Sequence, residues 1–507
     1  MRFRSSAGAS WRAFFGGAPA LLVFTALAFA FSVAFTAAAS TRPHIGGTLR
    51  VELRERVPTL DPRVRPGEAE AARAQEMLDA LVFDRLLRFD DHGQPASALA
   101  VAWQSENEGK RWRFQLRTDV QLSDGTPLTA EIAAAALAPE VAVELGGDAQ
   151  VSGAGQWVTI ESQEAMPDLP QQLAAGRNFI FRVAADGKSL VGTGPFVLAY
   201  WDSGATAQQD VFTANEHCWA GRPFVDRLTI SLGVESQRIE ADLEFGMTDA
   251  GELAPSEMRR AAERGVRTWS SQPVDLFVLA FDQRRPAVQD ARLRQAIAAA
   301  IDRTAIANVV LQRQATPAGA LLPEWISGYA FLFPAGPQPL PRLSDVAVKP
   351  AAPLVLVYDS QDAEARAVAE RVIVDLRAAG IFASAVPDGN SSSGGAPAAD
   401  VRLERIAIAQ PNAHAALALV LGTLTAPASP LATAPSTATE VGSASDDPES
   451  LYAAERAALA DFRIVPLAHA AENWGLGATL RDWLASPWGE VHLEDVWLDL
   501  PPAANPQ

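Results

Sequence analysis

The stretch ALAVAWQSENEGKRWRFQLRTDVQLSDGTPLTAE (Ala98–Glu131) carries the most information about the fold. Between Trp112 and Leu116, apolar side chains alternate with polar ones, which is the period-two pattern of a strand with one buried face. Asp124-Gly125 is typical of a tight turn, and Thr129 is placed to cap a helix that begins just after it. The segment therefore predicts a strand, a turn and a helix, and no residue in it has to be catalytic.

Strands and helices alternate along the rest of the chain, which predicts an α/β fold. The strand expected over 48–53 directs Leu49, Val51 and Leu53 inward. The strand–helix–strand order over 354–386 implies a right-handed crossover and parallel pairing. Further strands are expected at 197–201, 225–232, 354–358, 381–386 and 462–467. Helices are expected at 69–87, 129–138, 363–380 and 449–460.

Two successive helices are expected between Val288 and Leu311, with Asp290 and Asp302 as their caps. The second of these helices is expected to bury three side chains, Ile306, Val309 and Val310. Two stretches are of low complexity. Residues 389–399 are expected to form a mobile loop, and residues 423–448 another loop or a partly disordered insert.

Length and composition narrow the class of protein. A chain of 507 residues is too long for one core and predicts two or three domains. The net charge of −18 disfavours nucleic acid as a partner. A single cysteine, Cys218, excludes an intrachain disulfide, and the six scattered histidines have no helical metal-ligand spacing. No nucleophile elbow or phosphate-binding loop occurs, so we expect no metal site, no cofactor and no enzyme activity.

The N-terminal segment, residues 1–39, indicates export. It begins with three arginines and continues with an apolar run free of charge from Ala13 to Ala39. Small residues at 37–39 suit cleavage by signal peptidase near Ala39, whereas the length of the run also fits an uncleaved membrane anchor. In either case the body of the protein is expected to be periplasmic or otherwise extracytoplasmic.

Several segments resemble, in the same order, the extracytoplasmic solute-binding proteins of the peptide/nickel class (solute-binding protein family 5), which serve ABC importers. The segments are GGTLRVEL with PTLDP, FDRLLRFDDHGQPASALAVAW, GTGPFVLAYW, ANEHCWAGRPFVDRLTI, RRPAVQDARLRQAIAAAIDRTAIANVV, AERVIVDLRAAGI and DFRIVPLAH. The resemblance implies a two-lobed fold of the periplasmic-binding-protein type (class II-like), with a small domain inserted in the first lobe. The implied boundaries are 46–85, 190–269 and 480–507 for lobe I, 86–189 for the inserted domain and 270–479 for lobe II.

The resemblance also implies where a ligand would bind. Arg54, Arg56 and Val57 follow the first strand at its cleft end, and an arginine there could hold a ligand carboxylate or simply be solvated. Other candidates are Phe281, Asp282 and Gln283 after a strand entering lobe II, and the aromatic residues Trp325 and Trp474, for which core packing is the alternative. Peptide-binding members use an aspartate in lobe II for the α-amino group. Here residues 405–445 contain none and offer Gln410, Asn412 and His414.

The sequence thus predicts an extracytoplasmic solute-binding subunit that captures a small, peptide-like solute and delivers it to ABC permease subunits in the inner membrane. We expect the protein to be a monomer. The alternative is a membrane-tethered sensor or scaffold with a degenerate cleft, a hypothesis that the long apolar N-terminus supports.

Overall fold

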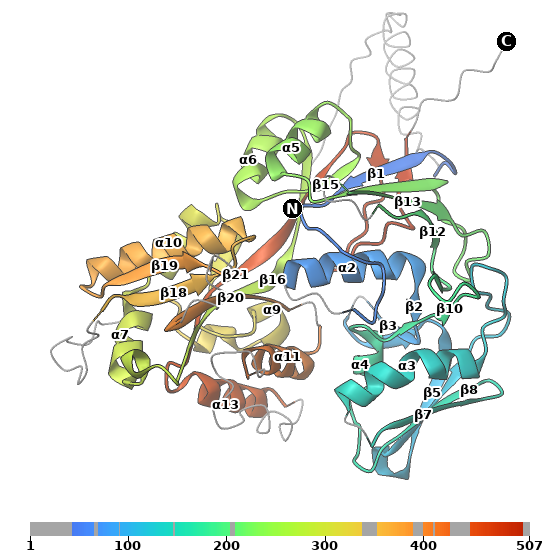
Figure 1. Cartoon of the computed structure of the whole chain (residues 1–507), viewed down its shortest axis with the longest axis horizontal. Coiled ribbons are helices and arrows are strands. Elements are labelled where there is room, and N and C mark those ends of the chain that lie inside the picture. The colour runs from blue at the N-terminus through green and yellow to red at the C-terminus, as the bar shows by residue number, and fades with distance from the viewer. Residues whose placement is uncertain are drawn as a thin grey trace, which may run out of the picture. The chain divides into compact units, whose positions relative to one another are not determined.

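The computed structural model describes residues 43–64, 69–90, 92–145, 148–202, 208–336, 352–388, 399–408, 411–425 and 447–499. The chain from His44 onward forms one compact unit (Figure 1). The N-terminal segment 1–39, Gln410, and most of the two low-complexity stretches (389–398 and 426–446) lie outside the described residues. The expectations for them therefore stay predictions.

One eleven-stranded sheet runs through the molecule in the order β12-β13-β14-β1-β15-β21-β16-β20-β18-β19, with β17 paired to β21. The strands are β1 (Thr48–Glu52), β12 (Phe196–Tyr200), β13 (Gln208–Ala214), β14 (Arg227–Leu232), β15 (Ala250–Glu252), β16 (Arg267–Phe281), β17 (Ala315–Pro317), β18 (Leu354–Tyr358), β19 (Ala383–Pro387), β20 (Val401–Ala407) and β21 (Ile464–Leu476). Two of them, β16 and β21, are long enough to belong to both ends of the sheet. Their pairing begins at Arg267↔Leu476 and continues to Ala280↔Ile464.

The N-terminal half of this sheet carries the first core. Leu49, Val51 and Leu53 are buried, as expected from the alternation. Helix α2 (Ala69–Val82) packs against this core, and helices α5 (Ser236–Glu244) and α6 (Pro255–Glu263) form a separate apolar cluster with the end of β15. Helix α2 ends five residues before the expected Leu87, because the chain turns at Phe83 into the short strand β2 (Asp84–Arg85).

Residues between Leu86 and Ile180 build a core of their own. It contains a four-stranded sheet, β5-β6-β8-β7, formed by Ala100–Glu106, Arg111–Leu116, Trp157–Glu161 and Gln150–Ala154. Helix α3 (Ala130–Glu144) packs on it, and Thr129 caps this helix by accepting a hydrogen bond from Ile132 N. The expected helix end at Ala138 was wrong, because the chain continues helical through Pro139 with buried side chains on either side of the proline.

Short elements complete the N-terminal half. They are β3 (Leu87–Phe89), β4 (Pro95–Ser97), η1 (Asn107–Gly109), α4 (Leu169–Ala174), β9 (Phe179–Ile180), β10 (Arg182–Val183), β11 (Leu190–Val191), β22 (Leu480–Arg481) and β23 (Trp497–Leu498).

The C-terminal half of the sheet is covered on both faces. Along β16, Phe277 and Leu279 point to one core, whereas Leu276 and Val278 point to another. The first core is closed by α7 (Ala291–Ala300), η3 (Ile306–Val310) and α10 (Ala363–Ala378), and the second by α9 (Glu324–Ser327), α11 (Ala413–Thr425) and α13 (Pro448–Leu459). Two short helices, α8 (Arg303–Ala305) and η4 (Ala330–Leu332), precede η3 and follow α9. A short 3₁₀ helix, η2 (Pro286–Val288), precedes α7. Strands β18 and β19 pair in parallel, which confirms the expected parallel pairing.

Three expectations for this half need correction. Asp290 and Asp302 do cap α7 and α8, but Val309 is 61% exposed because residues 306–310 are wound as a π-helix. The strand expected at 462–467 begins at Ile464 and runs on to Leu476. The loop expected at 423–448 is helical at both of its ends, in α11 and α13.

Candidate functional site

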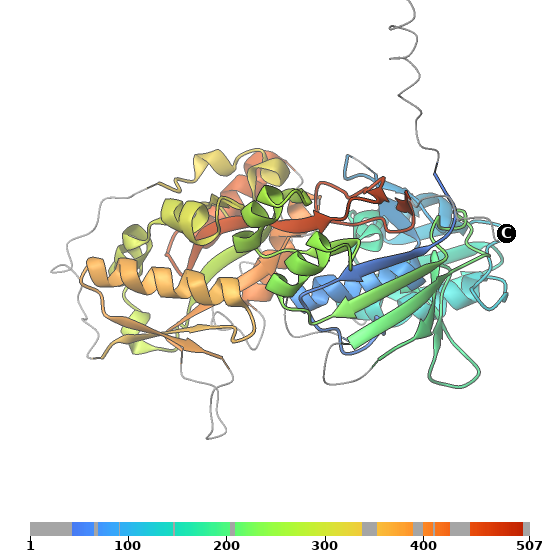
Figure 2. The same ribbon diagram turned by 90° about the horizontal axis from the view of Figure 1, so that it is seen from above.

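Strands β16 and β21 pass from one half of the molecule to the other (Figures 1 and 2). A pocket lies beside them, lined by Phe277 of β16 and by residues 470–473 of β21. The register of the two strands shifts on both sides of Pro273, which has no N–H to give to the ladder. Beside this irregularity, Ser271 Oγ accepts a hydrogen bond of 2.9 Å from Glu472 N. The junction therefore combines a locally irregular ladder with a polar interior.

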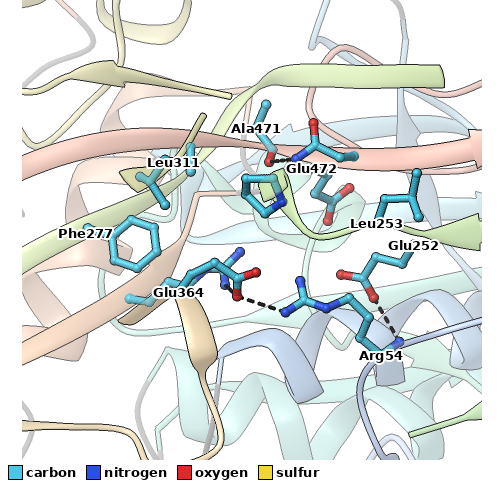
Figure 3. Close-up of a pocket in the computed structure, with 12 residues that line it drawn as sticks. Arg54, Glu252, Leu253, Phe277, Leu311, Glu364, Ala471 and Glu472 are labelled. Carbon is cyan, nitrogen blue, oxygen red and sulfur yellow. Dashed lines mark hydrogen bonds and ion pairs between the residues drawn. The ribbon is translucent and has the colours of Figure 1, made fainter. Parts of the chain in front are cut away.

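Arg54 crosses the pocket from the loop after β1 (Figure 3). Its Nη2 donates to Glu364 Oε2 of α10 at 2.8 Å, and its backbone N–H donates to Glu252 Oε2 at 3.2 Å. The side chains of Arg54 and Glu364 are 13% and 10% exposed. Because β1 belongs to the first half and α10 to the second, this ion pair joins the two halves.

A second group of ion pairs lies beside the first. Asp275 of β16 accepts from Arg405 of β20, with Nη2···Oδ2 of 2.6 Å, and also from Arg73 of α2. Arg73 Nη1 reaches Glu472 Oε1 of β21 at 2.6 Å, and the Arg405 guanidinium lies 5.2 Å from the centre of the Phe277 ring. Arg73 therefore ties helix α2 to both long strands.

Burial shifts the acid–base behaviour of these groups. Burial raises the pKa of Glu472 to about 7, while the neighbouring Arg73 guanidinium opposes the rise. Burial also raises the pKa of Glu252. Burial together with the Arg54 guanidinium lowers the pKa of Arg405 to about 9, so Arg405 keeps its charge at neutral pH. For Arg54, burial acts in the opposite direction to the carboxylates of Glu364 and Glu252, and the carboxylates prevail and raise its pKa.

The protein's own side chains fill most of this space. The free volume that a water molecule can enter is about 10 Å³, close to the room that one water needs. The lining residues are Arg54, Glu252, Leu253, Pro255, Phe277, Leu311, Glu364, Arg405, Ala470, Ala471, Glu472 and Asn473. In this arrangement the site can bind a water molecule, and a larger solute requires the two halves to separate.

Of the suggested binding-site residues that the structure describes, which leaves out Gln410, only Arg54 lines this pocket. Val57 is buried in the core of the first half. Arg56 is exposed, and its side chain packs over Gly233. Trp474 is 4% exposed in the same core and packs on Trp483.

The remaining candidates lie in the second half. Phe281 is a core residue at the end of β16, and Asp282 just after it pairs with Arg284. Gln283 donates to the Phe281 carbonyl. These three follow Phe277 by four to six positions, which places them ~13 Å or more along the strand from the pocket.

Three further candidates make structural contacts. Trp325 Nε1 donates to the Pro273 carbonyl at 2.7 Å, beside the junction, and Asn412 caps α11 by accepting from Ala415 N. His414 Nδ1 lies 3.3 Å from Asp168 Oδ2, so α11 contacts the start of α4 in the first half.

Most residues of the pocket were missed from the sequence. Glu252 ends a three-residue strand, Glu364 stands in the first turn of α10, and Arg405 follows Val401 and Leu403 at the next alternate position of β20. A charged residue where the pattern of the strand predicts an apolar one, as at Arg405 and Glu472, is the local signal that marked these two residues. Among the described residues, no cluster of three or more metal-ligating side chains occurs, and no helix is long and apolar enough to cross a membrane.

Comparison with known proteins places the chain among transport receptors. A family model described as bacterial extracellular solute-binding proteins, family 5 Middle, matches residues 94–385. The nickel-binding periplasmic protein of Escherichia coli is 25% identical over 361 residues, which are 63% of this chain and 68% of the relative. The probable D,D-dipeptide-binding periplasmic protein DdpA of Escherichia coli is 24% identical over 278 residues, which are 49% of this chain and 52% of DdpA.

Solved structures share the fold. NikA from Brucella suis in complex with Fe(III)-EDTA superposes with a TM-score of 0.75 at 20% identity, covering 89% of this chain and 100% of NikA. The oligopeptide-binding protein AppA from Bacillus subtilis, in complex with a nonapeptide, gives a TM-score of 0.69 at 15% identity and covers 90% of this chain and 100% of AppA. These likenesses confirm the expected two-lobed α/β fold.

Proposed function

We propose, from the premise that this chain belongs to the bacterial extracellular solute-binding proteins of family 5, that it captures a small solute between its two lobes and passes it to the permease subunits of an ABC importer. The observation that carries the proposal is the pocket at the junction of the halves, where charged groups from both of them converge. Closure around a solute removes both partners from water and strengthens each polar contact.

The charges around the pocket favour one class of solute. Three carboxylates line it, Glu252, Glu364 and Glu472, against two guanidinium groups, Arg54 and Arg405. A solute with a positive group, such as the α-amino group of a peptide, offsets this excess, whereas an anionic solute adds to it. We therefore propose a peptide-like solute with a free amino group. Burial is the largest cause of the raised pKa values of Glu252 and Glu472, so a positive group placed beside these carboxyls would offset part of the cost of burying their charge.

A thermal-shift screen of the purified protein tests this proposal. The probes are di- and tripeptides with free amino termini, the same peptides N-acetylated, Ni(II)–histidine, and simple sugars. A bound solute raises the apparent stability by mass action, so free peptides are expected to raise the melting temperature and their acetylated forms to do so less. A screen in which no probe shifts the melting temperature contradicts solute capture. Equal shifts from free and acetylated peptides contradict only the role of the amino group.

The proposal extends to location and assembly. The protein acts outside the cytoplasm as a monomer, exported by its N-terminal segment and then either released by cleavage near Ala39 or anchored. Cell fractionation with N-terminal sequencing of the product tests export, and light scattering after size-exclusion chromatography tests the monomer. A product that begins at Met1 in the membrane fraction contradicts release. None of the proteins compared favours the tethered sensor.

A further inference from the structure

The ion pair between Arg54 and Glu364 connects the two lobes and must break when they separate. Arg54 follows β1, whose Leu49 and Val51 are fixed in the core of lobe I. Glu364 stands in the first turn of α10, which is part of the core of lobe II. Any motion that separates the two cores must therefore lengthen the Nη2···Oε2 contact of 2.8 Å.

The same guanidinium fills space that a solute would need. Arg54 lines the pocket together with Glu364 and Arg405, and only about 10 Å³ remains for water. Small-molecule sites in proteins enclose about 300–1,000 Å³, so no solute of that class fits beside Arg54 in this arrangement. Solute entry and the Arg54–Glu364 contact are therefore mutually exclusive in the arrangement described.

The electrostatics favour the contact. Arg54 has a second carboxylate within reach, because the side chain of Glu252 accepts from the Arg54 backbone N–H and adds to the negative potential at the guanidinium. Glu364 in turn has a second cation, since Arg405 Nη1 lies 3.6 Å from Glu364 Oε2. The side chains of Arg54 and Glu364 are both largely buried. Buried ion pairs are screened by salt less than ion pairs at the surface.

We propose that Arg54 and Glu364 form a latch that closes the two lobes on each other, so that the protein binds solute only from the fraction of molecules in which the latch is open. The affinity observed for a solute is then reduced by that fraction. The inference goes beyond solute capture itself, because it concerns the equilibrium of the protein without any solute added.

The test measures the separation of the lobes in the absence of solute. Spin labels are placed at Val143→Cys on α3 and Ala453→Cys on α13, two exposed positions, in a Cys218→Ser background, and their distance distribution is measured by pulsed electron resonance. In the parent protein we expect one short, narrow population. In Arg54→Gln and in Glu364→Gln we expect a longer population to grow about tenfold, the change that corresponds to about 1.4 kcal/mol.

Arg366→Gln is the matched control. It removes an arginine–carboxylate contact from the same helix, the exposed pair with Glu370, which joins nothing across the lobes. We expect its distance distribution to equal that of the parent. The double variant Arg54→Gln/Glu364→Gln is expected to open no further than either single variant, because both remove the same contact.

The latch is overturned if the distributions of Arg54→Gln and Glu364→Gln superimpose on that of the parent, or if Arg366→Gln opens the lobes as much as they do. Circular dichroism identifies a variant that fails to fold, in which case the other half of the pair provides the measurement. Because no solute enters the experiment, failure of the latch leaves solute capture standing, and failure of the thermal-shift screen leaves the latch standing.

Discussion

Replacing Asp79 with asparagine should stabilise the protein, and by an amount that grows with pH. Asp79 lies on α2 with 1% of its surface exposed, and its Oδ1 has no hydrogen-bond partner among the described residues. Burial raises the pKa of Asp79 from its ordinary value of 3.8 to about 8, although the Arg177 guanidinium and the Gln75 side chain oppose the rise. The folded protein thus holds a proton on Asp79 up to about pH 8, whereas the unfolded chain releases it near pH 4.

The sign follows from proton linkage. Where the folded state binds more protons than the unfolded state, the free energy of unfolding falls as pH rises, here by about 1.4 kcal/mol per unit between pH 4 and 8. Asparagine resembles the protonated acid and has no such dependence. The stability gained by Asp79→Asn should therefore increase by about 3 kcal/mol from pH 5 to pH 7, and reach about 4 kcal/mol at pH 7 if the amide fits as the acid does.

Urea denaturation of parent and variant at pH 5, 6, 7 and 8 measures this difference. Glu370→Gln is the control, since Glu370 is exposed in a surface ion pair and should change stability by less than about 1 kcal/mol at every pH. Parallel curves for Asp79→Asn and the parent across this range would show that Asp79 is ionised in the folded protein, and would refute the reasoning.

Substitutions at three other positions test the fold. Burial lowers the pKa of His469 to about 4, so the unfolded chain takes up a proton at a higher pH than the folded protein does. The free energy of unfolding of the parent should therefore fall by about 2 kcal/mol from pH 6.5 to pH 5. Urea denaturation of His469→Gln should not show this loss. Thr129→Ala should lower the free energy of unfolding by about 1 kcal/mol through loss of the α3 cap, whereas Thr129→Ser should retain most of it. Gly153→Ala should cost about 1–3 kcal/mol in thermal denaturation, because its Cβ would overlap the carbonyl oxygen of Ala130; an unchanged melting temperature would contradict this packing.

The sequence predicted those elements that depend on local patterns. The strand at Trp112–Leu116, the caps at Thr129 and Asp290, and the parallel pair β18–β19 all rest on residues close to one another in the chain. Strand β21 shows the limit. Its first residues are apolar, but Glu472 and Asn473 interrupt the pattern in its second half. The partner that makes Glu472 acceptable in a buried strand is Arg73, about 400 positions earlier in the chain.

The pocket was harder to predict for the same reason. Its carboxylates and guanidinium groups come from β15, β20, β21, α10 and the loop after β1, and no spacing in the sequence reveals that they converge. Arg54 was suggested because it follows a strand that faces the cleft in the family. Trp474 is an aromatic residue of the kind that lines binding clefts, but its side chain is buried in the core of lobe I. Burial of a large apolar ring is decided by the packing of distant elements, which residue type alone does not report.

The ion pairs at the junction make lobe separation depend on charge compensation. Asp275 and Glu472 lie on the two strands that run through both halves of the sheet, and Arg73 contacts both of them from α2. Arg54 and Glu364 lie on different lobes and must part. Separation leaves Glu364 with Arg405 as its remaining cation, and leaves Arg54 to water. A solute that brings a positive group to Glu364 replaces the charge of Arg54 that the separation took away. A solute without such a group leaves the buried Glu364 carboxylate without enough positive charge around it, which costs stability. Under the proposed latch, charge compensation at Glu364 therefore links lobe closure to the choice of solute.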